Sequence, residues 1–383
     1  MAGLCIARND YGLIHFSIML RIFSIIRRFD WLLLGAVVLL ICFGLAALYS
    51  ITVSFEQPNF FNFQKQVLFA LAGLALLFSL GIVDYRFWKG MGGIAYLAAA
   101  GLLVTVLFLG RVISGTRGWF VLGGVNFQTV ELAKLALLIF LAGFLSTRTV
   151  STKGLLNFLL SGLAAAVLCG LVLLQPDFGS AIILFLLWFL LTLLAGADKR
   201  YVISVMLLFA VLFGLSWVYF FQDYQRDRIM TFFNPQADPY NRGYHVRQAT
   251  IAVGAGGWLG RGLGFGSQSQ LKFIPASQTD FIFAVVAEEL GLFGVSLVLV
   301  LWAVVFYRLG RAALRCRDDF ATLFIVGVSI VFFSQVMINI GMNVGLLPVT
   351  GIALPFLSYG GSFLVVSLML VGLVQSMVAR TQR

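Results

Sequence analysis

The sequence predicts an all-α fold: a polytopic membrane helical bundle of ten transmembrane helices, with one large extracytoplasmic loop between the seventh and the eighth. Of the 383 residues, 61% are apolar and only 11% are charged, and the mean hydropathy is +1.01. Soluble domains carry about 25% charged residues, so this composition is typical of membrane proteins. Apolar stretches of about 20 residues, enough for a helix to cross a bilayer, recur along the chain, whereas the alternating segments of about 10 residues that indicate a membrane barrel are absent.

The ten predicted spans are joined by short connections and one long loop. They are Trp31–Tyr49, Val67–Val83, Gly92–Leu109, Val130–Phe144, Leu155–Leu174, Ser180–Ala195, Tyr201–Phe221, Phe281–Tyr307, Phe320–Met342 and Ser362–Ala379. Residues 1–30 are predicted to form an N-terminal tail, and residues 31–383 a single transmembrane domain that includes the long loop, 222–280. Loops of this length are usually functional or disordered, and because this one holds aromatic residues and both signs of charge, we expect it to cover the outer mouth of the bundle.

The distribution of basic residues predicts the orientation of the chain. With the N-terminus in the cytoplasm, the connections on that side hold sixteen Lys and Arg, whereas the short outward loops hold only Lys65, Arg111 and Arg117. Since basic residues collect on the cytoplasmic side of membrane proteins, both termini are predicted to be cytoplasmic. The same rule accounts for the net charge of +11, so we expect no nucleic-acid partner. The two histidines and four widely spaced cysteines predict no metal site built from these residues.

Asp280 is the main candidate for chemistry, because it stands directly before the apolar run of the eighth span. An aspartate at a helix start is typical of a cap and stabilises the helix by roughly 1 kcal/mol. At the outer interface, partly shielded from water, the same carboxylate could act as a general base on a sugar hydroxyl. The two interpretations are compatible.

Two further pairs of charged residues lie within predicted spans. Glu288 and Glu289 lie about 12–13 Å deeper than Asp280 along a helix, where ionisable groups must face protein or water, so we interpret them as buried structural partners rather than catalytic groups. Glu131 and Lys134, spaced i, i+3, form either an intrahelical ion pair or, through the ammonium, a contact for a pyrophosphate.

Three other patterns favour particular roles. Five of the arginines predicted on the outward face are candidate phosphate ligands: since guanidinium matches phosphate geometry, we expect at least one to bind an anionic ligand, with solvated surface as the alternative. The glycines between Gly254 and Gly266 have no βαβ context, which argues against a nucleotide loop and favours flexible or tightly packed backbone. Asn339 and Asn343, inside the ninth span, are predicted to form interhelical hydrogen bonds. The arginines are Arg117, Arg226, Arg228, Arg242 and Arg247.

Several ordered segments resemble motifs of the SEDS family of peptidoglycan glycosyltransferases, and they cover nearly the whole chain after the N-terminal tail. The sequence Pro348-Val-Thr-Gly-Ile352 is more similar to the elongation branch of the family, RodA, than to the division branch, FtsW. The segments are Gln175-Pro-Asp-Phe-Gly-Ser-Ala181, Asn234-Pro-Gln-Ala-Asp-Pro239 with Gly243-Tyr244, Gly266-Ser-Gln-Ser-Gln-Leu271, Thr279-Asp-Phe-Ile-Phe-Ala-Val285, Glu288-Glu-Leu-Gly291, Asn339-Ile-Gly-Met342, Gly345-Leu-Leu-Pro-Val-Thr-Gly-Ile352 and Leu354-Pro-Phe-Leu-Ser-Tyr-Gly-Gly-Ser362.

The resemblance implies an enzyme of the bacterial inner membrane that polymerises lipid II into glycan strands during cell elongation, with its active site facing the periplasm. It implies that Asp280 occupies the place of the family's essential aspartate and that the partners are a class B penicillin-binding protein and the elongation machinery. It also admits a divalent cation, Mg²⁺ or Mn²⁺, as a cofactor. Carried over by motif, the substrate-binding residues are Arg117, Glu131, Lys134, Asp177, Arg226, Arg228, Gln248, Gln270 and Ser358.

The chain departs from the family pattern at three places. Pro275-Ala276 stands where the family has Pro-Glu, so a carboxylate near Asp280 is missing. Gln128-Thr-Val-Glu131 replaces the usual Gln-Pro-Ser-Glu, and Gly118 separates Arg117 from Trp119, where the family often has Arg-Trp adjacent. The last two departures bear on the role of Arg117.

Three alternative functions remain at this point. A lipid II flippase would need a hydrophilic pathway through the bundle, for which the spans offer little beyond Glu288, Glu289, Asn339 and Asn343. A scaffold would only activate its penicillin-binding partner. A division polymerase of the FtsW type would perform the same chemistry at another stage of growth.

Overall fold

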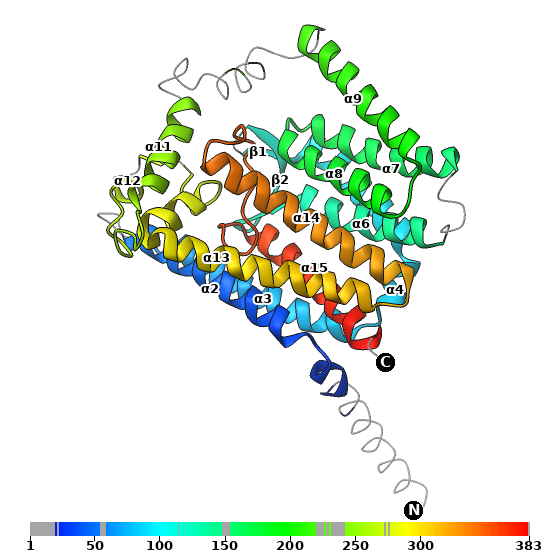
Figure 1. Ribbon diagram of the computed structural model, residues 1–383, viewed down its shortest axis with the longest axis horizontal. Helices are drawn as coiled ribbons and strands as arrows, with labels where there is room; N and C mark the ends of the chain where they lie inside the picture. Colours follow the sequence, from blue (N-terminus) through cyan, green and yellow to red (C-terminus); the bar gives the residue numbers. More distant parts are fainter. Residues whose placement is uncertain are drawn as a thin grey trace, which may run out of the picture.

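The computed structural model is a mostly helical bundle (Figure 1). It describes residues 20, 23–53, 59–113, 115–147, 154–219, 226, 230, 242–271, 273–274 and 276–381. The helices are α2 (Trp31–Val53), α3 (Phe61–Ile82), α4 (Tyr85–Gly90), α5 (Gly92–Leu109), α6 (Thr129–Ser146), α7 (Leu155–Leu173), α8 (Phe178–Leu194), α9 (Lys199–Tyr219), α11 (Arg242–Ala255), α12 (Ser267–Gln270), α13 (Ile282–Arg315), α14 (Asp319–Asn343) and α15 (Gly361–Thr381).

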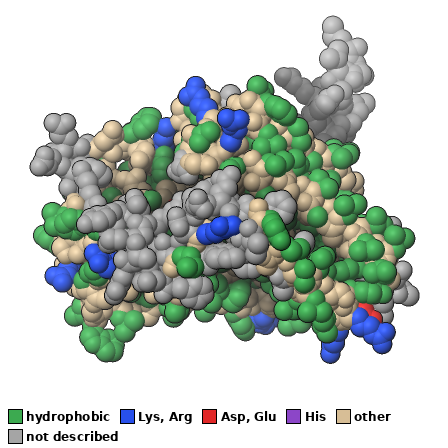
Figure 2. All heavy atoms as spheres, turned by 90° about the horizontal axis from the view of Figure 1, so that it is seen from above, with side chains coloured by type: hydrophobic (Ala, Val, Ile, Leu, Met, Phe, Trp, Pro, Cys, Tyr) green, Lys and Arg blue, Asp and Glu red, His purple; other side chains and the backbone are tan. Residues whose placement is uncertain are grey.

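Each of the ten predicted spans coincides with one of these helices. Among the described residues, eight helices are both long and apolar enough to cross a membrane; α8, with 17 residues, falls just short in length. The membrane bundle is therefore confirmed, whereas the count of ten crossings stays a prediction. Many large apolar side chains, such as Leu156 and Leu194, are mostly exposed, as expected for a surface in contact with lipid. On the face in Figure 2, apolar side chains of the described residues outnumber charged ones.

One small element, which the sequence interpretation did not include, adds to the predicted helical bundle. Between α5 and α6 the chain forms a small antiparallel sheet of β1 (Arg111–Ile113), β2 (Thr116–Leu122) and β3 (Val125–Gln128), in the order β1-β2-β3. Gly123 and Gly124, both with positive φ, form the two-residue turn between β2 and β3, and Leu122 pairs with Val125 across it. A Gly-Gly pair flanked by β-branched and aromatic residues favours this turn, so the hairpin has a sequence signal that hydropathy alone does not detect.

The core lies where α15 packs against α3, α14 and α6, and small residues allow the closest approach. A Cβ placed on Gly372 would lie 2.7 Å from the carbonyl oxygen of Leu77, so only glycine fits there. Away from Asp280, at the end of the bundle that holds α4, Gln375 exchanges two hydrogen bonds with the backbone of Asp30, whose carboxylate forms an ion pair with Arg308 at 2.7 Å. This network fixes the start of α2 against α13 and α15.

The glycine-rich segment packs tightly against a break in α13. Gly291 interrupts α13 with φ 63° and ψ −162°, and the backbone of residues 257–262 forms hydrogen bonds with residues 288–293 at that break. A Cβ on Gly256 or Gly260 would lie 1.9 or 2.1 Å from a carbonyl oxygen of α13, which no side chain tolerates. Of the two interpretations of these glycines, tightly packed backbone is therefore correct.

Candidate active site

Asp280 lies just before the first turn of α13, and its main chain is held by α14. Its carbonyl oxygen accepts hydrogen bonds from the side-chain amides of Asn339 at 2.9 Å and Asn343 at 3.0 Å. Both asparagines are fully buried. The predicted interhelical hydrogen bonds of these two residues are thus confirmed, and their target is the peptide of the candidate base.

The carboxyl group of Asp280 is partly buried beside a glycine loop. A Cβ placed on Gly351, which has φ +75°, would lie 3.7 Å from Oδ2 of Asp280. Burial raises the pKa of Asp280 to about 6, and a hydrogen bond with the side chain of Thr279 opposes this shift. Desolvation disfavours the charged carboxylate, so near neutral pH this group is poised to accept a proton.

A second set of hydrogen bonds fixes the residues that precede Asp280. Ser358, which is buried, donates to the carbonyl oxygen of Thr279 at 2.6 Å and accepts from the backbone N–H of Leu354. The N–H of Tyr359 donates to the carbonyl oxygen of Gln278 at 2.8 Å. From α3, the side chain of Gln66 donates to the carbonyl of Ser358 and accepts from the N–H of Gly360. Ser358 therefore lies next to Asp280 but holds backbone through its hydroxyl.

Three other predicted residues gather at the start of α6 and α8. Lys134 and Glu131 form a buried ion pair at 2.7 Å, and the Lys134 ammonium lies 5.4 Å from the ring centre of Phe363. Asp177 caps α8 by accepting from Ser180, and its carboxylate also accepts from the side chain of Gln128 at 3.3 Å. The intrahelical ion pair is thus the contact that Lys134 makes here, while a contact with pyrophosphate stays a prediction.

The segment 354–363 connects these two groups. Near one end of this segment, the hydroxyl of Ser358 donates to the carbonyl oxygen of Thr279. Near the other end, the hydroxyl of Ser362 accepts from the N–H of Gln128, and the ring of Phe363 faces the ammonium of Lys134. Gly179 of the Gln-Pro-Asp-Phe-Gly motif also approaches this region, since a Cβ there would lie 2.8 Å from the carbonyl oxygen of Thr350. Motifs far apart in the sequence therefore meet around one short segment.

The remaining predicted residues lie on other elements, and one of them lies outside the described residues. Arg117, on β2, is exposed, and its guanidinium donates to the carbonyl oxygen of Leu107 at 3.4 Å. Gln248 lies on α11, which packs against α13, and Gln270 ends α12. Arg226 is partly buried, and Arg228 lies outside the described residues. Substrate contacts of these residues stay predictions.

Glu288 and Glu289 are buried structural groups, as the sequence predicts. Glu288 accepts from the backbone N–H groups of Gln268 at 2.7 Å and Ser269 at 2.9 Å, so it caps α12. Glu289 accepts from the hydroxyl of Ser50 on α2 at 2.6 Å. Both carboxylates therefore join α13 to neighbouring segments.

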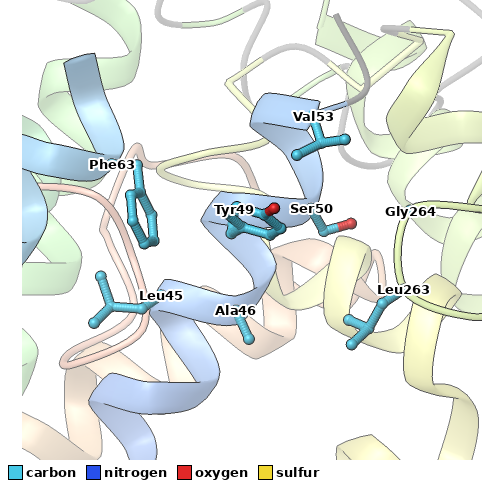
Figure 3. A pocket seen from close by; sticks show the side chains of 8 residues that line it. All are labelled: Leu45, Ala46, Tyr49, Ser50, Val53, Phe63, Leu263 and Gly264. Carbon is cyan, nitrogen blue, oxygen red and sulfur yellow. The ribbon is translucent and has the colours of Figure 1, made fainter. Parts of the chain in front are cut away.

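A cavity of about 390 Å³ lies beside Ser50, between α2, α3 and the glycine-rich segment (Figure 3). Apart from the Ser50 hydroxyl, its lining is almost entirely apolar, and Tyr49, Val53 and Leu263 are about half exposed. The lining residues are Leu45, Ala46, Tyr49, Ser50, Val53, Phe63, Leu263 and Gly264.

The described residues contain no group of three His, Cys, Asp or Glu side chains that could hold a metal ion. Near Asp280 the family's second carboxylate is replaced by Ala276. The divalent cation suggested by the resemblance therefore remains a prediction.

The sequence interpretation missed Gln66 as part of this site. It is 3% exposed within an apolar helix and uses both ends of its amide to hold the 358–360 segment. A buried amide in a span is costly unless it is bonded, so its position in an apolar run is the signal that could have identified it.

Comparison with known proteins places this arrangement in a family. The family model FtsW/RodA/SpoVE, described as cell cycle proteins, matches residues 30–383. The chain is 37% identical to the probable peptidoglycan glycosyltransferase FtsW of Nitrosococcus halophilus, covering 90% of this chain and 91% of that protein. It is also 37% identical to the peptidoglycan glycosyltransferase MrdB of Escherichia coli, covering 79% and 82%.

Solved structures agree with the sequence relatives. A chain from a peptidoglycan synthase complex, described as coordinating polymerization and crosslinking, superimposes with a TM-score of 0.80 at 32% identity, covering 92% of this chain and 98% of the other. The rod shape determining protein RodA of Thermus thermophilus superimposes with a TM-score of 0.69 at 30% identity, covering 92% and 97%. The chain therefore belongs to the FtsW/RodA/SpoVE family of membrane proteins.

Proposed function

We propose that this chain is a peptidoglycan glycosyltransferase that polymerises lipid II, with Asp280 as the general base. The observation that carries the proposal is one partly buried carboxyl at the start of a membrane helix, with a pKa raised by burial to about 6 and a main chain held by two side chains of α14. Relatives that share nearly the whole chain are named as peptidoglycan glycosyltransferases, which supports the same reaction here.

In the proposed reaction Asp280 takes the proton from the 4-hydroxyl of an acceptor sugar. The freed oxygen forms a bond to the anomeric carbon of the donor sugar, while the bond from that carbon to phosphate breaks and its electron pair leaves with the polyprenyl pyrophosphate. A base with a pKa near the working pH is effective in such a step. The described residues of the site offer no second nucleophile, so we expect a single displacement, which inverts the anomeric configuration.

The membrane geometry suggests where the substrate lies. We place the Asp280 end of the bundle at the periplasmic face of the inner membrane, with both termini in the cytoplasm, because basic residues concentrate in the connections at the other end. The apolar cavity beside α2 suits part of the substrate's hydrocarbon chain, because it is open and lined by aliphatic and aromatic groups (Figure 3). The sugar head would then stay at the interface, near Asp280.

The flippase alternative is less well supported by the buried polar groups. Glu288, Glu289, Asn339 and Asn343 are all at most 1% exposed, and each forms hydrogen bonds with neighbouring segments. They therefore do not line a hydrophilic path through the part of the bundle that the structure describes.

The test is polymerisation of purified lipid II by the purified protein, resolved on gels. Asp280→Ala and Asp280→Asn should each reduce the rate by about 10²–10⁴-fold, the range expected for loss of a general base. Asp319→Asn, which removes an exposed carboxylate at the opposite end of the bundle, is the matched control and should retain the full rate. Substantial polymer formation by folded Asp280 variants would refute the assignment.

We further propose a class B penicillin-binding protein as partner and a role in elongation. The similarity to a chain of a peptidoglycan synthase complex and the RodA-like Pro348-Val-Thr-Gly-Ile352 motif support these points. Assays of the complex with the partner's own catalytic site disabled separate an enzyme from a scaffold. Restoration of rod shape in cells that lack their elongation polymerase separates elongation from division.

A further inference from the structure

Asn343, the last residue of α14, inserts its side chain into the start of α13. Its amide nitrogen donates to the carbonyl oxygen of Asp280 at 3.0 Å, and its amide oxygen accepts from the backbone N–H of Ala284 at 3.1 Å. Residues 280 and 284 are the i and i+4 positions that bond directly to each other in an α-helix. The asparagine amide thus takes the place of the helix's own hydrogen bond.

This insertion accounts for where α13 begins. The regular helix starts at Ile282, and Phe281 precedes it with φ −108° and ψ 20°, outside the helical region. Asp280 is therefore bonded to the helix through Asn343 instead of forming part of it. Its carboxyl consequently occupies the turn before the helix, where the loop around Gly351 borders it.

Asn339 supports the same arrangement from one helical turn away on α14. Its amide nitrogen donates to the carbonyl oxygens of Asp280 at 2.9 Å and Ile352 at 2.7 Å, and its own backbone carbonyl accepts from the Asn343 amide at 2.8 Å. The two asparagines therefore connect the peptide of Asp280, the first turn of α13 and the 350–352 loop. Simple packing between helices would not require these bonds to meet at a single carbonyl.

We propose that Asn343, supported by Asn339, is a positioning residue that holds Asp280 out of helix α13 and thereby sets the direction of its carboxyl. The inference rests on the proposed function of Asp280 as the base. When Asn343 is lost, the carbonyl of Asp280 keeps the bond from Asn339 and the N–H of Ala284 keeps its bond to the carbonyl of Phe281, but the link between Asp280 and Ala284 is broken. We therefore expect the turn before α13 to rearrange and the carboxyl of Asp280 to move. Displacements of about 1 Å at a reacting group are known to cost up to 10²-fold in rate.

The test compares Asn343→Leu with Gln335→Leu in the lipid II polymerisation assay. Gln335 lies two turns earlier on α14, is equally buried, and has an amide oxygen without a partner among the described residues, so its replacement deletes a buried amide away from Asp280. We expect kcat of Asn343→Leu to fall about 10- to 100-fold with KM for lipid II within twofold of wild type. Gln335→Leu should retain the wild-type kcat and KM.

A pH–rate profile separates positioning from a loss of general stability. In the Asn343→Leu variant the acid limb of the pH–rate profile should move to lower pH by at least half a unit, because the carboxyl of Asp280 leaves its partly buried position. A structural defect would instead lower the rate equally at every pH. Among the described residues, two other ionisable side chains lie near this region: His245 of α11, whose ring centre lies 6.5 Å from that of Phe281, and Tyr359. If the His245→Gln variant has the same acid limb in its pH–rate profile as the wild type, that limb belongs to Asp280.

Asn343→Asp covers the case in which the leucine variant does not fold. It keeps the volume and the oxygen that accepts from Ala284 but removes the amide donor to Asp280, so it should also lower kcat with little change in KM. A folded variant of either kind with wild-type kcat and an unshifted acid limb overturns the inference. The proposed function itself fails separately, if Asp280→Asn polymerises lipid II as fast as wild type.

Discussion

Asp280 and Glu288 lie eight residues apart, yet the protein holds them in opposite ways. The carboxylate of Glu288 is fully buried and accepts two hydrogen bonds from backbone N–H groups, so the protein holds this residue by its side chain. Asp280 is held instead by its main chain, whose carbonyl oxygen accepts from Asn339 and Asn343, while its carboxyl remains partly exposed. An acid whose acceptor sites are used by the protein stabilises structure, whereas an acid whose backbone is held and whose carboxyl is open can meet a substrate.

The largest expected effect tests the structural half of this comparison. Glu288→Ala leaves the N–H groups of Gln268 and Ser269 buried without a partner, so we expect a loss of roughly 3–5 kcal/mol in the free energy of unfolding. Glu288→Gln keeps one acceptor oxygen and should lose less. Thermal unfolding of the purified variants in detergent measures both, and a fully stable Glu288→Ala would show that this carboxylate does not hold α12.

The pH dependence of the rate tests the catalytic half. A base must be deprotonated to act, and burial raises the pKa of Asp280 to about 6, so kcat should be constant above pH 7 and fall about tenfold per unit well below pH 6. Polymerisation rates between pH 4.5 and about 8 check this limb. An acid limb near pH 4, the range of an ordinary aspartate, would contradict the burial of this carboxyl.

The same shift predicts a gain of stability on removing the charge. The folded-state pKa of Asp280 is raised above its ordinary value of 3.8, so the folded protein holds this proton more tightly than the unfolded chain does. The stabilisation of the folded state that results from this proton is complete below pH 3.8 and is lost as the pH rises toward 6. Asp280→Asn should therefore be more stable than wild type at pH 7, by about 1–3 kcal/mol, and equal to it below pH 4. Unfolding temperatures of the two proteins at both pH values measure the difference, and a less stable asparagine variant at pH 7 would reverse the sign of this argument.

Much of this arrangement could be predicted from the sequence. Hydropathy identified every long helix, because a span needs only enough consecutive apolar residues. The spacing of Glu131 and Lys134 gave their ion pair as one of two interpretations, and the depth of Glu288 and Glu289 in a span predicted structural roles. Each of these conclusions depends on neighbours along one helix.

The parts that the sequence did not predict depend on contacts between distant segments. The sequence predicts that Asn343 bonds to another helix, but not that its partners are Asp280 and Ala284. Likewise it does not indicate that Gln66 of α3 holds the 358–360 segment. The hairpin at Gly123 and Gly124 is a different case, since its turn signal was present but lay in a chain dominated by apolar helices.

The smallest expected effect compares two glycines with the same backbone conformation. Gly351 has φ +75° beside Asp280, and Gly345 has φ +77° beside Thr250. Alanine at either position should cost about 1 kcal/mol, because L side chains disfavour positive φ. Only the methyl group at position 351 would lie 3.7 Å from the Asp280 carboxyl, in ordinary contact, where it displaces water and raises the pKa further. Gly351→Ala should therefore move the acid limb of the rate to higher pH while Gly345→Ala leaves it in place, and equal profiles would mean that this loop does not border the working carboxyl.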